Sequence, residues 1–233
     1  PNQQPGRTRD HYQAVVTMTT NLREENGFTL VELMVASLMT MMVLGGAVAL
    51  TSQIQNGYRR QMEDSAGEQE ARYALEWVGR YIRGADNNPF SVGTSECPAA
   101  GTVFTGIVID PNADGVNDDI TLQTDSNPPD GLIGGDGVTC TQANEHVTIS
   151  LDNVNNTIVF LDEAVGEGAT TRTDSVIDNL EFVYRDSSHN VTNVAADVIY
   201  IETRITIRSR TINPATGLPN TRMLSGEVRV RSR

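Results

Sequence analysis

One loop holds the residues whose types and spacing best suit chemistry. The run from Asp110 to Asp119 alternates oxygen-bearing residues with others, and Gly115 stands at its sixth position. A short loop wraps a hard cation in this way, with oxygens at alternate positions and a glycine at the sharp turn. The candidate calcium ligands are Asp110, Asn112, Asp114, Val116 (through its backbone carbonyl) and Asp118.

The loop departs from an EF-hand in two respects. Its twelfth position is Thr121 rather than a bidentate glutamate, and no helical pattern flanks it. These departures exclude an EF-hand and leave a looser calcium loop of the extracellular kind. The alternative is a solvated turn of Asp, Asn and Gly between two strands. We expect that the protein requires no cofactor. The one ion that the sequence suggests as a ligand is Ca²⁺.

Catalytic groups do not cluster in the sequence. The three histidines, His11, His146 and His189, are far apart in the sequence. The sequence has no Gly-x-Ser-x-Gly elbow, phosphate-binding loop, dinucleotide fingerprint or His-Glu-x-x-His motif. We therefore predict that this chain is not an enzyme.

A single carboxylate, Glu32, lies in the apolar run from Phe28 to about Leu50. A helix over this run is long enough to cross the ~30 Å hydrocarbon core of a bilayer. A charged residue near the centre of such a segment costs roughly 2.5–3.5 kcal/mol on insertion scales, so by default it indicates a function. A plain glutamate that snorkels to the interface is the simpler alternative.

The apolar run has three interpretations. It is a transmembrane anchor, a secretory signal cleaved near Ala47-Val48-Ala49, or a processed assembly helix. The run Gly27-Phe28-Thr29-Leu30-Val31-Glu32 resembles the processing motif of type IV prepilins and type II secretion pseudopilins. That resemblance implies cleavage after Gly27 by a prepilin peptidase and N-methylation of Phe28. It also implies assembly in which Glu32 meets the Phe28 amine of a neighbouring subunit.

On this interpretation residues 1–27 are a polar leader, with the true start expected at Met18 and residues 1–17 left out of the fold. Residues 28–50 form the transmembrane half of a long helix, and residues 51–84 form its soluble half. The apolar stripe of the soluble half is Ala71, Ala74, Leu75, Val78 and Ile82. Gly84 is the expected helix stop, and Gly45, Gly46 and Gly57 are weak points. Trp77 and Tyr81 are expected in the core, with a recognition patch as the alternative.

Residues 85–233 are predicted to form a head with an acidic loop at 110–137 and antiparallel strands over 147–233. A short strand is expected near 120–124, and Asp152–Asn156 is the expected hairpin turn between strands 147–151 and 157–161. Longer strands are expected at 176–186, 197–210 and 223–233. Because no helical pattern separates the strands, the predicted class is α+β, with an antiparallel sheet packed on the long helix.

Bulk composition limits the partners and the compartment. The net charge is −13 and all 17 basic residues are arginine, so binding to nucleic acid is not expected. If the head is extracytoplasmic, Cys97 and Cys140 can form a disulfide. On the loop-entropy model this disulfide would stabilise the folded chain by about 3–4 kcal/mol. The alternative is two unpaired thiols.

The segment Glu70-Ala-Arg-Tyr-Ala-Leu-Glu76, followed by Arg80-Tyr-Ile-Arg83, is also similar to the pilin W and pseudopilin J group. The resemblance implies a minor type IV pilin in a priming or tip complex with other pilins. The precursor would be a single-pass inner-membrane protein with a periplasmic head, later placed in a pilus at the cell surface. Alternatives are pseudopilin J of a type II secretion system, or a membrane-anchored or secreted calcium-binding adhesion module.

Overall fold

The computed structural model describes residues 27–95, 97, 101–126, 128–135, 140–166, 168–213 and 216–231. The predicted leader, with its start at Met18, lies outside the described residues apart from Gly27. The chain divides into two compact units, Pro1–Gln53 and Ile54–Arg233.

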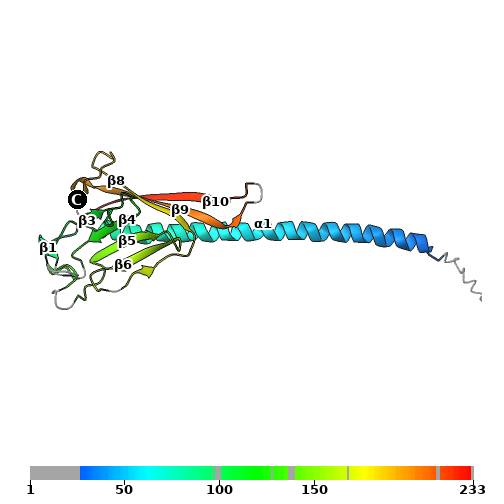
Figure 1. Ribbon diagram of the computed structural model, residues 1–233, viewed down its shortest axis with the longest axis horizontal. Helices are drawn as coiled ribbons and strands as arrows, with labels where there is room; N and C mark the ends of the chain where they lie inside the picture. The colour runs from blue at the N-terminus through cyan, green and yellow to red at the C-terminus, as the bar shows by residue number, and fades with distance from the viewer. Residues whose placement is uncertain are drawn as a thin grey trace, which may run out of the picture. The chain divides into compact units, whose positions relative to one another are not determined.

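The long helix α1 spans Leu30–Gly84, 55 residues in one helix (Figure 1). No proline occurs in this range, and the predicted weak points at Gly45, Gly46 and Gly57 stay helical. The helix ends at Gly84, the residue predicted to stop it. The left-handed backbone that usually follows a helix belongs to Asp86, with φ 60°, rather than to the glycine.

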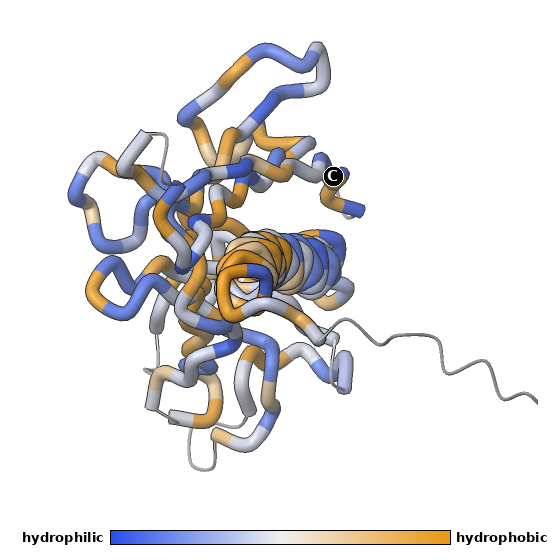
Figure 2. Tube along the Cα trace, turned by 90° about the vertical axis from the view of Figure 1, so that its right-hand side faces the viewer, coloured by the Kyte–Doolittle hydropathy of each residue, from blue (hydrophilic) through white to orange (hydrophobic). Residues whose placement is uncertain are grey.

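In the first unit, the described residues belong to the start of α1 and the three residues before it. Every residue from 27 to 53 is exposed. The near end of the helix in Figure 2 is mostly orange, the colour of apolar residues. So long an apolar surface is unfavourable in water, and it therefore calls for lipid or for other helices around it.

The second unit contains the rest of α1 and all the strands of the described chain. The strands and the single 3₁₀ turn are β1 (Thr94–Ser95), β2 (Thr102–Val103), β3 (Ile107–Ile109), β4 (Asp119–Gln123), β5 (His146–Asp152), β6 (Thr157–Asp162), β7 (Thr170–Thr171), β8 (Ile177–Arg185), η1 (Ala195–Asp197), β9 (Tyr200–Ile212) and β10 (Pro219–Arg229). The order is one helix followed by strands, which confirms the predicted α+β class.

The described strands form separate antiparallel sheets rather than the single sheet that was expected. Their orders are β1-β2, β10-β9-β8 and β3-β4-β5-β6-β7. The outer edge of β8 forms hydrogen bonds with loops instead of with a neighbouring strand. The N–H of Phe182 donates to Asn117 O, and the N–H of Ile177 donates to Asn156 O. These bonds join the two larger sheets without merging them.

The second part of α1 packs on both larger sheets. Figure 1 draws β10 above this part of the helix and β6 below it. Four of the five residues of the predicted stripe are fully buried and Leu75 is partly buried. Gly79 lets β10 come close, since a Cβ there would lie 3.1 Å from Val228 Cγ2. Leu180, Phe182 and Tyr184 of β8 fill the core as their alternation predicted.

Candidate functional site

The peptide bond at the predicted cleavage point is open to solvent. Gly27 and Phe28 precede α1, and the Phe28 side chain is 84% exposed. A Cβ on Gly27 would meet no heavy atom within 4 Å. Nothing in the described chain therefore blocks access to the bond between these two residues.

The first turn of α1 is closed by Thr29 and Glu32 acting on each other. The backbone N–H of Glu32 donates to Thr29 Oγ1 over 3.2 Å, and the N–H of Thr29 donates to Glu32 Oε2 over 3.4 Å. This reciprocal pair is a capping box, with Thr29 as N-cap and Glu32 at the third helical position. This capping box was not among the sequence-based predictions, although the Thr-x-x-Glu spacing is a signal for it.

The charge on Glu32 is favoured where it stands but is not neutralised by a basic side chain. An acidic residue in the first turn complements the positive end of the helix dipole. No salt bridge in the described part of the chain involves Glu32. The second carboxylate oxygen, Oε1, is thus open to a cation from outside.

Behind this turn lies a helix suited to a bilayer. Among the described residues, α1 alone is long and apolar enough to cross a membrane, and its most apolar stretch has no buried residue. The first turn therefore places one open carboxylate at the entrance of an apolar helix.

The structure brings the predicted calcium-loop residues together, and their oxygens accept hydrogen bonds from the loop itself. Asp110 accepts the N–H groups of Asp114 (3.1 Å) and Gly115 (2.8 Å), and Asp114 accepts that of Val116 (2.8 Å). Asn112 Oδ1 also accepts the N–H of Asp114, over 2.9 Å. Asp110, Ala113 and Gly115 have positive φ angles, which give the sharp turn.

Two carboxylates at the end of this loop are buried. Asp118 accepts from the side chain of Asn153 over 3.4 Å, and burial raises its pKa. Burial raises the pKa of the neighbouring Asp119 to about 6, against the lowering effect of the N–H of Asn112. Asp119 Oδ1 has no partner in the described chain. No group of three or more His, Cys, Asp or Glu side chains among the described residues is arranged to hold a metal ion.

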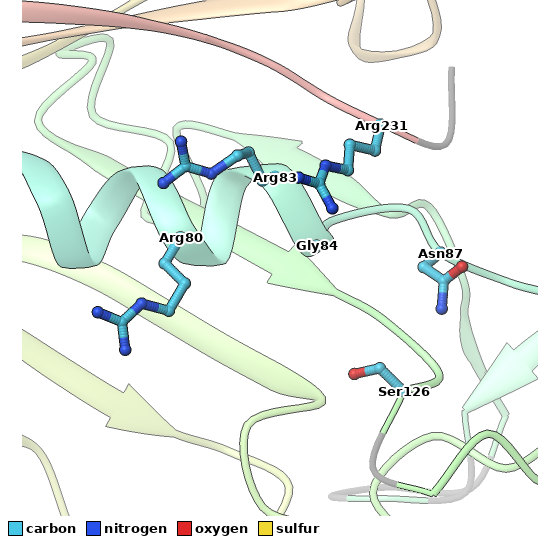
Figure 3. A pocket seen from close by; sticks show the side chains of 6 residues that line it. All are labelled: Arg80, Arg83, Gly84, Asn87, Ser126 and Arg231. Atoms are coloured by element: carbon cyan, nitrogen blue, oxygen red, sulfur yellow. The ribbon is translucent and has the colours of Figure 1, made fainter.

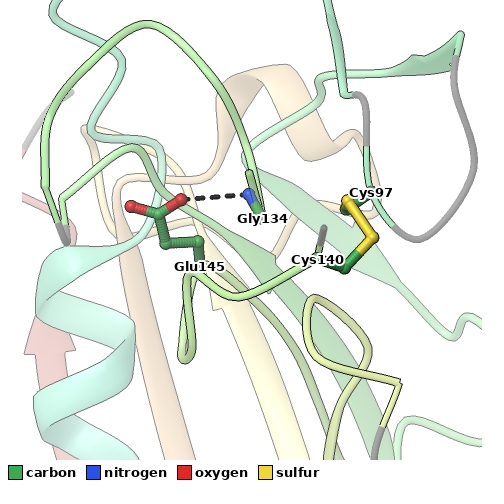
Figure 4. Close-up of a disulfide and its surroundings, with 4 residues drawn as sticks. All are labelled: Cys97, Gly134, Cys140 and Glu145. Atoms are coloured by element: carbon green, nitrogen blue, oxygen red, sulfur yellow. Dashed lines mark hydrogen bonds between the residues drawn. A yellow bond between two sulfur atoms is a disulfide. The ribbon is translucent and has the colours of Figure 1, made fainter. Parts of the chain in front are cut away.

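A disulfide joins Cys97 to Cys140, with 43 residues of sequence separation (Figure 4). Beside it, the buried Glu145 carboxylate accepts the N–H of Gly134 over 3.0 Å and that of Ser126 over 2.9 Å. Gly134 has φ +78° and lies against Cys97, where a Cβ would approach the Cys97 Cβ to 2.7 Å. The disulfide and the buried carboxylate together fix this part of the head.

The two histidines that the structure describes are not brought together. His146 is buried in β5, with Nε2 3.5 Å from Glu163, whereas His189 is exposed after β8 and stacks on Tyr200. His11 lies outside the described residues.

Comparison with known proteins identifies the N-terminal motif. The family model of the prokaryotic N-terminal methylation motif matches residues 22–48. Neither the comparison with curated proteins nor that with solved structures found a match. The motif implies processing by a prepilin peptidase and assembly with other pilins, and the apolar helix that carries it fits a precursor anchored in the inner membrane. This motif, at the start of a long helix packed on antiparallel sheets, supports a type IV pilin-like protein.

Proposed function

We propose that this chain is a minor pilin, a structural subunit that is cleaved after Gly27, methylated on Phe28 and built into a pilus or its priming or tip complex. The supporting observation is the first turn of α1. There one oxygen of Glu32 holds the Thr29 N–H, and the other is open at the start of an exposed apolar helix.

The open oxygen suits the amine that cleavage would create. A new Phe28 N-terminus carries a positive charge, and a neighbouring subunit would present this charge to Glu32. Each group is costly alone in hydrocarbon, and pairing offsets both costs. The head would lie in the periplasm before assembly and at the cell surface afterwards. Similarity of residues 70–83 to the pilin W and pseudopilin J group supports a minor subunit, and pseudopilin J of a type II secretion system is the alternative within that group.

The mass and N-terminal sequence of the mature protein test this proposal. We expect a terminus at methylated Phe28 in cells that contain a prepilin peptidase, and an intact leader in cells that lack it. A terminus near Leu50 would show a cleaved secretory signal instead. An uncleaved chain in both cells would leave a simple anchor, as in a membrane-bound adhesion module.

We also propose that the loop at Asp110–Asp118 takes up Ca²⁺ weakly. In support, Asp119 Oδ1 is buried without a partner next to the loop, and carboxylate and carbonyl oxygens are what Ca²⁺ prefers. The hydrogen bonds within the loop support the alternative of an ordinary turn. Melting temperatures with and without calcium decide between the two.

A further inference from the structure

Two hollows on the second unit share one arginine. The first, of about 460 Å³, is lined by Arg80, Arg83, Gly84, Asn87, Ser126 and Arg231 at the end of α1 (Figure 3). The second, of about 160 Å³, is lined by Tyr73, Trp77, Arg80, Tyr81, Phe160 and Arg172. We call the two together the Arg–aromatic surface. Arg80 makes them neighbours along one stretch of the head.

The arginines of this surface lack the carboxylate partners that four arginines of β8, β9 and β10 have. Arg83, Arg172 and Arg231 take part in no salt bridge in the described chain, and Arg80 meets only the exposed Glu76 at 3.9 Å. The arginines of β8, β9 and β10 that do pair with carboxylates are Arg185, Arg204, Arg208 and Arg222. In a chain of net charge −13, four unpaired or weakly paired arginines are thus gathered in one place.

Helix electrostatics account for only part of this arrangement. Arg83 lies in the last turn of α1, where a cation complements the helix dipole. Arg231 comes from the other end of the chain, and Figure 3 shows its side chain reaching back toward the last turn of α1. Arg172 follows β7 and lies over the Phe160 ring, 4.7 Å from its centroid. Three separate parts of the fold therefore supply positive charge to one surface.

The second hollow gathers four of the twelve aromatic side chains, which are six Tyr, five Phe and one Trp. Trp77 is 7% exposed and its indole N–H has no acceptor among the described residues. Its ring meets those of Tyr81 and Phe160 edge to face. Tyr73 is 59% exposed at the rim. The result is a small hollow lined by four aromatic rings and two arginines, with an unpaired indole N–H buried in its wall.

The residue types indicate a protein ligand. Trp, Tyr and Arg dominate the binding energy of protein interfaces, and the arginine fork binds carboxylates through two hydrogen bonds. Sugars and bases prefer open ring faces for stacking, but Arg172 covers Phe160 and Trp77 is buried. A long polyanion would also reach past this patch to the rest of the surface, where the net negative charge of the chain would repel it.

We propose that the Arg–aromatic surface docks an acidic segment of a partner protein. Carboxylates of the segment bind Arg80, Arg83 and Arg231, and one apolar or aromatic side chain enters the hollow beside Trp77. This docking is separate from N-terminal processing, so either proposal can fail without the other.

Trp77 is the only tryptophan and therefore reports directly on the hollow. The full chain, in detergent micelles, is titrated with a capped peptide of five glutamates around one phenylalanine while tryptophan emission is recorded. We expect a saturable change that high salt weakens. Arg83→Gln with Arg231→Gln should weaken binding about tenfold or more. Arg72→Gln, an exposed arginine of the same helix outside both hollows, should leave it unchanged.

Three results would overturn the proposal. One is no saturable change with the peptide while the protein is folded by circular dichroism. Another is equal binding of the peptide in which glutamine replaces glutamate. The third is tighter binding of inorganic phosphate or of an oligogalacturonate, which would assign the surface to small anions or to acidic saccharides.

Discussion

Thr29 and Glu32 bond to each other at the start of α1, side chain to backbone in both directions. The carboxylate that looked anomalous in an apolar run thus has a role within its own subunit, because it satisfies an N–H that the helix leaves unpaired. Only one of its oxygens is used. Glu32 can therefore cap its own helix and bind a neighbour's amine at the same time.

Substitutions at the two residues separate capping from docking. Glu32→Gln keeps a side-chain oxygen for the Thr29 N–H but removes the charge, so we expect normal membrane insertion and poor assembly. Thr29→Val removes the cap, at a cost of about 0.5–2 kcal/mol to the helix start, but keeps the charge. We expect it to assemble. Immunoblots of sheared pili and of membranes measure both fractions.

The opposite pattern would contradict the docking role. If Glu32→Gln assembles normally and Thr29→Val does not, the carboxylate serves the helix rather than the neighbouring subunit. Ser37→Ala is a suitable control, because the Ser37 hydroxyl bonds only within the helix, to Met34 O over 2.8 Å.

Period-two and period-3.6 patterns predicted most of the elements, because burial on one face leaves a trace in the sequence. Ile201, Ile205 and Ile207 alternate with polar residues in β9, and that alternation located the strand. Its start was wrong by three residues, since residues 197–199 complete η1 and its exit instead of pairing. β10 begins at Pro219, four residues before the predicted start, because a hairpin pairs Pro219 with Ile212.

The division into separate sheets could not be predicted in the same way. It depends on which loops satisfy the outer edge of β8, and bonds such as Phe182 N–H to Asn117 O leave no periodic signal. The Arg–aromatic surface was hidden for a similar reason. Trp77 and Tyr81 were visible at helical spacing, but Phe160, Arg172 and Arg231 join them only through the fold.

Gly79 is predicted to be needed for the contact between α1 and β10. In Gly79→Val the new side chain would enter the space of Val228, whose Cγ2 lies 3.1 Å from the Cβ position. We expect a loss of about 1–3 kcal/mol in the free energy of unfolding, measured by urea denaturation. Gly57→Ala is the matched control, because nothing lies within 4 Å of that site and the helix gains up to about 1 kcal/mol. Equal stability of both variants would show that β10 moves freely.

Glu202 is predicted to stabilise the head at neutral pH and to lose this effect in acid. Hydrogen bonds from Arg204 and then Arg185 lower the pKa of this carboxyl, through Arg204 Nε and Arg185 Nη2, each at 2.9 Å. Because the folded pKa is lower than the unfolded one, this stability is present above about pH 4.5 and is lost as the pH falls through the folded pKa. Glu202→Gln should therefore cost about 1–3 kcal/mol at pH 7 and progressively less below pH ~4.

Thermal melts from pH 7 to pH 3 check this dependence. Asp178→Asn breaks the more exposed pair with Arg208, at 3.5 Å, and should change stability by at most about 0.5 kcal/mol at any pH. A Glu202→Gln curve that runs parallel to the wild type at all pH values would mean that the carboxyl titrates alike in the folded and unfolded chain.

Calcium is predicted to stabilise the head through the loop at Asp110–Asp118. Extracellular calcium modules bind with Kd near 10⁻⁴–10⁻³ M, so about 10 mM calcium should raise the melting temperature by about 3–11 °C. Asp110→Asn with Asp114→Asn keeps a side-chain oxygen for each turn but removes two charges, and it should abolish the rise. Asp186→Asn alters a turn of the same kind, in which Asp186 accepts the N–H groups of Ser188 and Asn190. That control should keep the full rise, because it changes a turn carboxylate without touching the proposed ligands. A wild-type chain that melts at the same temperature with calcium as with magnesium would leave the loop as a turn closed by its own hydrogen bonds.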